Sequence, residues 1–481
     1  MKELKKSKNL IHKYCLNGFY ILLDTNSGAV HLVDEMIFDI LDLISLPMSE
    51  NIPEEILNNQ DLKKYNKQDV IEGYSEIFYL YKNGQLFSED SYKNFVSDQF
   101  KMPLKAMCLH IAHDCNLRCK YCFASTGDFG TSRSLMSLEV GKKAIDFLIK
   151  NSEARKNLEI DFFGGEPLMN FDVVKEIVKY AREQEKIYDK NFRFTITTNG
   201  VLLDDNKIDF INKEMSNVVL SLDGRKEIND KMRKTCNGAG SYDIIVDKFK
   251  NLAKKRNYEN YYIRGTFTKN NLDFLEDIVH FSDLGFDQIS IEPVVTDSSK
   301  DYAITESDLS RIFDEYENLA NEMIRRYKNK KQVLSEGKDV NKIKNKDRPF
   351  NFFHFMIDLD QGPCVLKRLR GCGSGNEYIA VTPEGDIYPC HQFVGKQEWK
   401  MGSVIDSSFN TEIKKTFADT NIYTKPDCQD CWAKFYCSGG CSANNLFYAG
   451  SLKKPYKISC EMMKKRLECA IMIRIVEKQI I

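Results

Sequence analysis

Twelve of the 15 cysteines fall into two groups with a long, almost cysteine-free stretch between them, and this distribution constrains the fold more than any other feature. Cys115, Cys119 and Cys122 lie within one short segment, and nine more cysteines follow residue 360. Only Cys236 lies between Cys122 and Cys364. An odd number of cysteines cannot all pair, and disulfide scaffolds are usually short secreted chains. The distribution therefore predicts one metal site near residue 115 and a separate metal-rich module at the C-terminus.

Composition narrows the class of protein. The 69 Lys and Arg residues nearly balance the 70 Asp and Glu residues, which argues against a nucleic-acid or other polyanion binder. A chain of 481 residues suits two or three domains. No stretch is apolar for long enough to span a membrane, and the basic start lacks a cleavable signal. We therefore expect a cytoplasmic protein without a membrane partner, in which clustered thiols stay reduced and bind metal.

A repeated strand-then-helix pattern occupies residues 104 to 300. Six apolar runs read as strands, at residues 106–112, 158–164, 192–198, 218–224, 262–268 and 288–294. Amphipathic stretches such as 138–150 and 173–186 separate them. The pattern predicts an α/β fold with a parallel sheet, either open or curled into a partial (β/α)6 barrel of the TIM type. Functional residues of such barrels lie at the C-terminal ends of the strands.

Four polar or glycine-rich motifs follow the first four of these strands. They are CNLRCKYC (115–122), GGEP (164–167), TNG (198–200) and SLDG (221–224). Because equivalent strand ends meet at one edge of a parallel sheet, the four motifs are expected to form one site.

Residues 1–95 are predicted to form a small domain of their own. FYILLD (19–24) and AVHLVD (29–34) read as strands joined by a turn, with helices at 35–44 and 68–84 and a last strand at 85–87. This order is winged-helix-like. The domain is either a structural cap or a module whose exposed strand accepts a peptide as an additional strand. The predicted division of the chain is 1–95, 100–345 and 346–481, with a lysine-rich solvated linker or helix face at about 325–348.

The spacing C-x3-C-x2-C is the most specific signal in the chain. Three thiolates on one loop can bind three irons of a [4Fe-4S] cluster and leave the fourth iron open for another ligand. A zinc site would require a fourth ligand nearby, and His113 is expected to be packed against the first strand.

These motifs resemble those of radical S-adenosylmethionine (SAM) enzymes, in which the three cysteines, with an aromatic residue before the last, precede GGEP. The resemblance implies that SAM binds the open iron and is cleaved to a 5′-deoxyadenosyl radical, which takes hydrogen from the substrate. It also implies that Glu166 faces the methionine ammonium of SAM and that Arg233 faces its carboxylate. The residues expected to bind SAM are Tyr121, Gly164, Gly165, Glu166, Thr198, Asn199, Ser221 and Arg233.

The C-terminal cysteines form the second strong signal. A hairpin turn at TPEGD (382–386) is expected to bring Cys372 and Cys390 together. The region resembles SPASM domains, which carry two auxiliary iron–sulfur clusters, so that the expected total is three [4Fe-4S] clusters. The resemblance assigns Cys372, Cys390 and Cys441 to the first auxiliary cluster, and Cys428, Cys431, Cys437 and Cys460 to the second. Cys364 is either the fourth ligand of the first auxiliary cluster, or it is not a ligand and one iron of that cluster stays open for a substrate thiolate. Zinc ribbons are the alternative for this region.

Three segments carry a closer resemblance: residues 12–41 (HKYCLNGFYILLDTNSGAVHLVDEMIFDIL), 109–130 (LHIAHDCNLRCKYCFASTGDFG) and 375–395 (GNEYIAVTPEGDIYPCHQFVG). Together they closely resemble the SCIFF peptide maturases, and the resemblance covers nearly the whole chain. The resemblance implies thioether cross-links between Cys thiols and acceptor carbons of a Cys-rich precursor, whose leader docks on the N-terminal domain. It also implies an electron donor such as flavodoxin or ferredoxin. His391 and Asp223 are the candidate bases.

Two alternatives remain open. One is an anaerobic sulfatase-maturing enzyme that makes formylglycine, although an aspartate normally follows the cysteine that corresponds to Cys390, and here His391 stands there. The other is a non-catalytic zinc-binding interaction protein.

Overall fold

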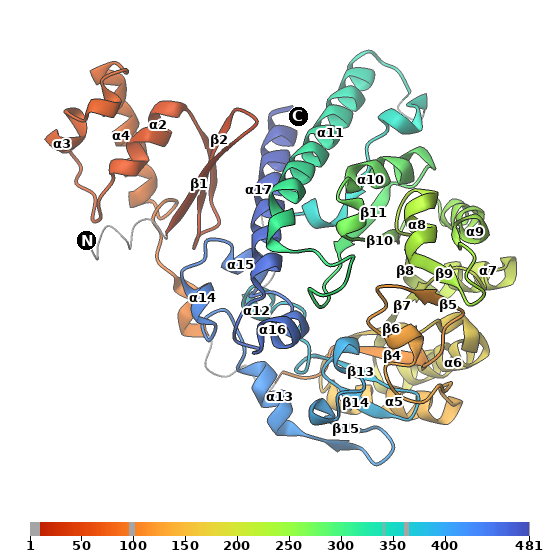
Figure 1. Ribbon diagram of the computed structural model, residues 1–481. Coiled ribbons are helices and arrows are strands. Elements are labelled where there is room, and N and C mark those ends of the chain that lie inside the picture. The colour runs from red at the N-terminus through yellow and green to blue at the C-terminus, as the bar shows by residue number, and fades with distance from the viewer. Residues whose placement is uncertain (1–9, 96–101, 340–341, 360–364, 481) are drawn as a thin grey trace.

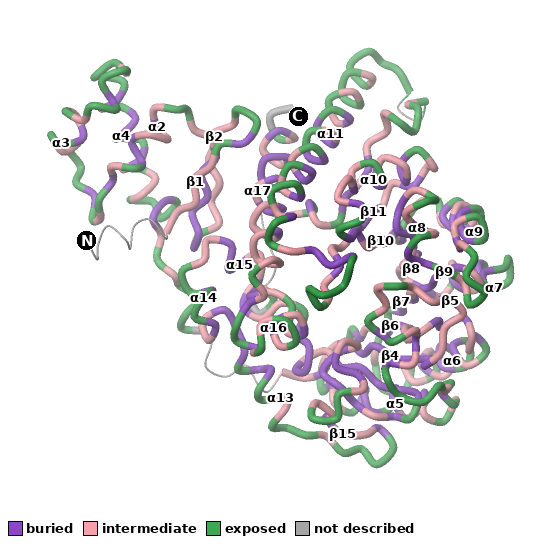
Figure 2. The backbone as a smooth tube through the Cα atoms, in the orientation of Figure 1, coloured by how far each residue is buried: buried purple, intermediate pink, exposed green. Residues whose placement is uncertain are grey.

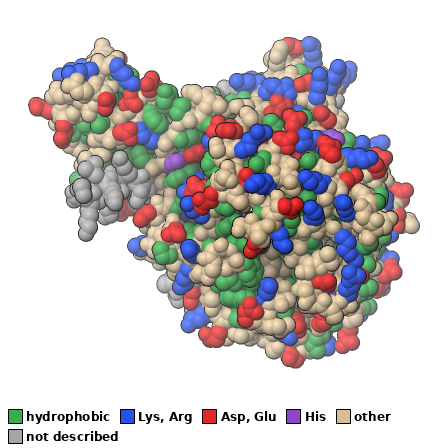
Figure 3. Space-filling model, viewed as in Figure 1, with side chains coloured by type: hydrophobic (Ala, Val, Ile, Leu, Met, Phe, Trp, Pro, Cys, Tyr) green, Lys and Arg blue, Asp and Glu red, His purple; other side chains and the backbone are tan. Residues whose placement is uncertain are grey.

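A computed structural model describes residues 10–95, 102–339, 342–359 and 365–480. Figure 1 shows a small N-terminal domain beside a larger body, in which the barrel strands and the C-terminal chain lie together. Figure 3 shows acidic and basic side chains mixed over the face in view, in keeping with the balanced composition. No helix among the described residues is long and apolar enough to cross a membrane.

The N-terminal domain is a three-stranded antiparallel sheet with helices against one side. Its elements are β1 (Ile11–Leu16), β2 (Phe19–Asp24), β3 (Val30–Val33), α2 (Glu35–Ile40), α3 (Glu54–Leu57) and α4 (Lys67–Lys82). The predicted pair of strands and the two helices are confirmed. The predicted strand at 85–87 is wrong, because Phe87 takes a left-handed φ of 54° and folds into the core of the domain.

The first strand, β1, is the element that sequence patterning missed, and it fastens the domain to the rest of the chain. The His12 ring stacks on Trp432 with centroids 3.7 Å apart, and His12 Nε2 lies 3.0 Å from a Glu468 carboxylate oxygen. Tyr14 donates a hydrogen bond to the Glu468 carbonyl. The side chains of β1 therefore pack against the C-terminal part of the chain, whereas β3 forms the opposite edge of the sheet.

The six predicted barrel strands are confirmed, and each lies beside the next in chain order. They are β4 (Ala106–Ala112), β6 (Asn157–Gly164), β7 (Asn191–Thr198), β8 (Met215–Ser221), β10 (Tyr261–Phe267) and β11 (Gln288–Pro293), all parallel. The helices between and after them are α5 (Leu138–Asn151), α6 (Phe171–Tyr188), α7 (Asp205–Glu214), α8 (Lys226–Met232), α9 (Tyr242–Lys255), α10 (Phe274–Asp283) and α11 (Leu309–Ser335). A separate pair, β5 (Leu117–Cys119) and β9 (Arg233–Thr235), is antiparallel.

The C-terminal chain extends this sheet from both edges. Beyond β11 lies β12 (Asn351–Phe352), and beside β4 lies β13 (Tyr378–Val381), each in parallel pairing. The sheet then continues through β14 (Asp386–Tyr388), β15 (Gly402–Ser403) and β16 (Ser408–Phe409). The predicted turn at 382–386 joins β13 to antiparallel β14. The remaining helices are α12 (Val365–Arg370), α13 (Thr411–Ala418), α14 (Pro426–Gln429), α15 (Lys434–Cys437), α16 (Ser442–Ala449) and α17 (Lys457–Ile480).

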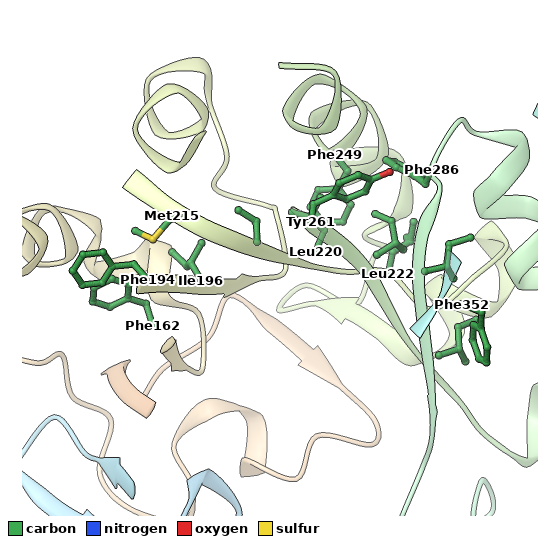
Figure 4. Packing of buried hydrophobic residues seen from close by; sticks show 14 of the residues in the cluster. Phe162, Phe194, Ile196, Met215, Leu220, Leu222, Phe249, Tyr261, Phe286 and Phe352 are labelled. Atoms are coloured by element: carbon green, nitrogen blue, oxygen red, sulfur yellow. The ribbon is translucent and has the colours of Figure 1, made fainter. Parts of the chain in front are cut away.

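Alternation along the strands separates the core from the barrel interior. On β6, Ile160 and Phe162 are fully buried in the main hydrophobic cluster. Figures 2 and 4 show this buried layer, in which Phe162 lies close to Phe194 and Ile196 of β7. The residues between them, such as Asp161 and Thr197, line a cavity instead. Successive side chains of a strand point to opposite faces, so one set of strands builds both the core and the site.

The lysine-rich stretch begins inside α11 and contains a buried arginine. The Arg326 side chain is 1% exposed. Its guanidinium donates to the Ser282 hydroxyl at 2.7 Å and to the carbonyls of Asn345 and Arg348 at 3.1 and 2.9 Å. Arg326 therefore ties the helix to the chain that returns toward β12.

Replacing Arg326 by alanine is expected to lower the apparent stability by about 3–5 kcal/mol, because buried partners lose their charge-assisted hydrogen bonds. Thermal unfolding followed by circular dichroism measures this effect. Arg325→Ala is the matched control: this neighbour is half exposed and pairs with Glu322 and Asp347, so its loss should cost less than about 1 kcal/mol. Equal costs for the two variants would contradict the assignment.

Candidate active site

The predicted SAM-binding residues lie around one cavity of about 140 Å³ at the C-terminal ends of β4, β6, β7 and β8. Its lining includes Cys115, Cys119, Cys122, Tyr121, Gly164, Gly165, Glu166, Thr198, Asn199, Ser221 and Arg233. The structure thus brings together all the residues that the sequence assigned to SAM and to the SAM-binding cluster. Asp223 lies behind this cavity, in contact with Tyr121.

Close packing of two loops shapes the cysteine loop. Gly165 lies so near Asp114 that an added Cβ would come within 2.1 Å of the Asp114 carbonyl oxygen. The Glu166 amide donates to that same oxygen at 2.9 Å. On the other side of the loop, β5 pairs with β9 so that Cys119 is opposite Arg233. A side chain at position 165 would push the two loops apart.

Glu166 is buried and held from three directions. It accepts hydrogen bonds from the Thr198 hydroxyl at 2.7 Å, the Asn199 amide at 2.8 Å and the Leu168 amide at 3.1 Å. Burial raises the pKa of the Glu166 carboxyl, and these hydrogen bonds oppose that rise. A carboxylate has about four lone-pair positions, so one remains for an ammonium group.

A buried chain of polar groups orients Arg233. Arg233 Nη1 donates to the Tyr121 hydroxyl at 2.8 Å, and that hydroxyl donates to an Asp223 carboxylate oxygen at 2.6 Å. Asp223 also accepts from the Thr266 amide at 3.1 Å. The Nε atom of Arg233 is buried and has no hydrogen-bond partner among the described residues. An unpaired guanidinium donor at the cavity wall fits an anionic group such as a carboxylate.

The three cysteines of this cavity suit a metal cluster. Burial raises the pKa of Cys115 to about 12 and that of Cys119 to about 11. These thiols are therefore protonated until a metal replaces the proton. Three sulfur ligands with nearby backbone amides match the donor set of an iron–sulfur cluster.

A second cavity, of about 590 Å³, adjoins the first, and we call it the chamber. Tyr121, Ser221 and Arg233 belong to the linings of both cavities. Phe163 also lines both cavities, and the rest of the chamber wall includes Asp161, Arg264, Thr266, Glu292, Cys372, Cys390, His391 and Cys441. Three SPASM-type cysteines therefore face the same space as the predicted SAM site.

His391 lies among aromatic rings in this wall. Its ring centroid is 5.5 Å from that of Phe123 and 5.1 Å from that of Phe163. Burial lowers the pKa of His391 to about 4, so the ring is neutral near pH 7.

The other predicted cluster cysteines line a third cavity, of about 500 Å³. They are Cys428, Cys431, Cys437 and Cys460. Lys425 is 2% exposed, donates from Nζ to the Gly439 carbonyl at 2.6 Å and faces thiols of both sets. Sequence reasoning missed Lys425, because a lysine directly before a short helix gives no sign of burial. Cys364 lies outside the described residues. Within the described ranges, no three His, Cys, Asp or Glu side chains are grouped to hold a single metal ion.

Two protein families match this chain, one over the barrel with the first cavity and the other over the C-terminal cysteine-rich region. The radical SAM superfamily matches residues 109–281, and the SPASM iron–sulfur cluster-binding domain matches residues 372–432. The chain is a radical SAM enzyme with a SPASM domain. Its cofactors are accordingly SAM, a [4Fe-4S] cluster and auxiliary iron–sulfur clusters, and the family match disfavours a zinc-binding interaction protein.

Known proteins similar to this radical SAM enzyme differ in how much of it they cover. A cysteine-type anaerobic sulfatase-maturating enzyme of Clostridium novyi (strain NT) is 27% identical over 69% of this chain and 86% of its own. The radical SAM cyclopropyl synthase TigE of Paramaledivibacter caminithermalis is 21% identical over 96% of this chain and 94% of its own. Streptococcus suis SuiB, solved with its precursor peptide SuiA, has a TM-score of 0.50 and 16% identity, and the match covers 94% of this chain and 98% of SuiB.

Joint replacement of Cys115, Cys119 and Cys122 by alanine is expected to abolish 5′-deoxyadenosine formation, because the cluster that binds SAM loses its ligands. Iron content should fall from about twelve to about eight atoms per chain if three [4Fe-4S] clusters are present. Product chromatography and iron analysis of anaerobically purified protein measure both effects. Retained SAM cleavage in the variant would contradict the site.

Proposed function

We propose that this radical SAM enzyme is a peptide maturase that forms thioether cross-links in a Cys-rich precursor of the SCIFF type. One observation carries the proposal: the chamber is lined both by residues of the SAM site and by Cys372, Cys390 and Cys441. An acceptor carbon and a substrate thiol can therefore meet in one space. A flavodoxin or ferredoxin is the expected electron donor.

The protein's share of this chemistry is binding and orientation. When bound, SAM and its cluster supply the radical that removes hydrogen from the acceptor carbon. Glu166 and Arg233 hold the two ends of the methionine moiety, and Tyr121 keeps Arg233 in place. Cys372, Cys390 and Cys441 hold the first auxiliary cluster, and Cys428, Cys431, Cys437 and Cys460 hold the second. Phe123 and Phe163 form an apolar part of the chamber wall that limits water around the reacting carbon.

The N-terminal domain supplies the docking site for the leader of the precursor. Its β3 edge has no strand partner among the described residues, and Leu32 on that strand is 41% exposed. An extended peptide can add a strand at such an edge, with main-chain hydrogen bonds for affinity and side-chain contacts for specificity. Similarity to SuiB, a protein solved with a precursor peptide, extends over 94% of this chain and supports this role.

Formylglycine formation, the activity of the sulfatase-maturing alternative, is the second candidate, because the Clostridium novyi relative is named a cysteine-type anaerobic sulfatase-maturating enzyme. Two features disfavour it. His391 stands where those maturases normally have an aspartate, and the relative covers 69% of this chain.

Co-expression with a short Cys-rich precursor encoded beside the gene tests the reaction. We expect the precursor mass to fall by two hydrogens for each bridge, with fragmentation blocked between the bridged residues. An unchanged mass would contradict the proposal. Conversion of a sulfatase-type Cys peptide to formylglycine would favour the second candidate.

Leu32→Glu is expected to weaken precursor binding by about tenfold or more, because it places a charge where the leader should pack. Calorimetry with the full precursor measures the affinity, and SAM cleavage without precursor should stay unchanged. Ile187→Glu on α6 is the matched control, since Ile187 is also an exposed aliphatic residue but lies on the barrel. Equal affinity of the Leu32 variant and the wild type would remove the docking role from β3.

A further inference from the structure

Two carboxyl groups of the chamber wall, Asp161 and Glu292, and a third just outside it, Asp223, differ in what surrounds them. Asp223 accepts from the Tyr121 hydroxyl and the Thr266 amide. Glu292 lies 3.2 Å from His354 Nε2 and 3.9 Å from nitrogens of Arg264 and Arg466.

Asp161 alone among these three has no hydrogen bond or ion pair to another described residue. Neither Asp161 carboxylate oxygen is among the fully buried side-chain atoms that lack a hydrogen-bond partner. The Asp161 side chain lines the chamber. Its carboxylate is therefore available to a substrate.

Strand alternation fixes where Asp161 points. Ile160 and Phe162 pack into the core, so Asp161 and Phe163 face the chamber. Asp161 is opposite Cys108 of β4 in the sheet. Cys108 packs in one buried cluster with Cys390 and Tyr378, so Asp161 lies on the side of the chamber where Cys390 lies.

The surroundings of Asp161 favour proton transfer near neutral pH. Burial, and after it the like charge of Glu159 on the same strand, raise the pKa of Asp161 to about 6. The facing groups on β4 and β13, Cys108 and Tyr378, have pKa values raised by burial and stay neutral there. A general base is most effective when its pKa lies close to the working pH.

We propose that Asp161 is the general base that accepts the proton of the substrate thiol in the chamber before the carbon–sulfur bond forms. The S–H bond breaks, an O–H bond forms on the Asp161 carboxylate, and the negative charge passes from oxygen to sulfur. The resulting thiolate lies beside Cys372, Cys390 and Cys441, and the proton leaves to water after the product departs. This inference rests on the proposed thioether chemistry.

Asp161 takes this role in place of the two candidates that the sequence suggested. Asp223 is engaged by Tyr121 and lies outside the chamber lining. His391 is packed against the aromatic rings of Phe123 and Phe163, so its ring is not free to approach a substrate thiol.

The test uses the reconstituted holoenzyme with full precursor. Asp161→Asn is expected to lower the cross-linking rate by about 10²–10⁴-fold, the usual contribution of a general base. Precursor affinity, iron content and 5′-deoxyadenosine formation without precursor should stay at wild-type values. Asp161→Glu, which restores a carboxylate, should recover part of the rate. An asparagine variant that cross-links within about threefold of wild type would overturn the proposal.

A pH profile separates a base from a merely structural residue. The wild-type rate should rise as pH increases through about 6, since Asp161 must be ionised, and the asparagine variant should lose this rise. Glu159→Gln is the matched control on the same strand and face. It should keep the full rate near neutral pH but move the rise to lower pH, because a like charge has been removed. An unchanged profile in Asp161→Asn would assign the titration to another group.

Infrared difference spectra give a readout that is independent of turnover. Between about pH 5 and about pH 7, wild-type holoenzyme should lose one protonated-carboxyl band that Asp161→Asn lacks. Absence of that band in wild type would overturn the proposal. If wild type forms no thioether, the proposed function and the role of Asp161 both fail. If wild type and Asp161→Asn both form it at similar rates, only the role of Asp161 fails.

Discussion

The parallel pairing of β13 with β4 is the contact on which the rest of the structure depends. The cysteine loop that we propose binds the SAM-binding cluster follows β4, and β13 leads through its hairpin to Cys390. Because Ala380 lies opposite Cys108, the ladder brings residues from the C-terminal third of the chain to the wall of the barrel. Without this pairing the SAM site would lie in an open half-barrel, and the SPASM cysteines would have no common space with it.

A single strand pattern then produces two different environments. Alternate residues of β6 and β7 fill the hydrophobic core, and the residues between them build the chamber. The core supplies the rigidity, and the chamber contains the unpaired or charged groups that a core excludes. Asp161 lies between the fully buried Ile160 and Phe162, so its backbone is fixed although its carboxylate is not.

The sequence predicted the six barrel strands and the position of their motifs, because long apolar runs and glycine-rich strand ends are local signals. It missed β1, whose mixture of His, Lys, Tyr and Cys is explained by docking against Trp432 and Glu468 rather than by alternation. It also misread residues 85–87, where burial of Phe87 outweighs strand propensity. The burial of Asp161 and Lys425 could not be predicted from the sequence, because it depends on segments that are distant in the chain.

The stacking of His12 on Trp432 and the contacts of His12 and Tyr14 with Glu468 also bear on how the protein is made. β1 leaves the ribosome long before the surface on which it rests, since Glu468 follows Tyr14 by 454 residues. Domains generally fold as they emerge during synthesis. The N-terminal domain is therefore expected to fold while His12 and Tyr14 still lack these partners, and its attachment to the rest of the chain is complete only after α17 has been translated.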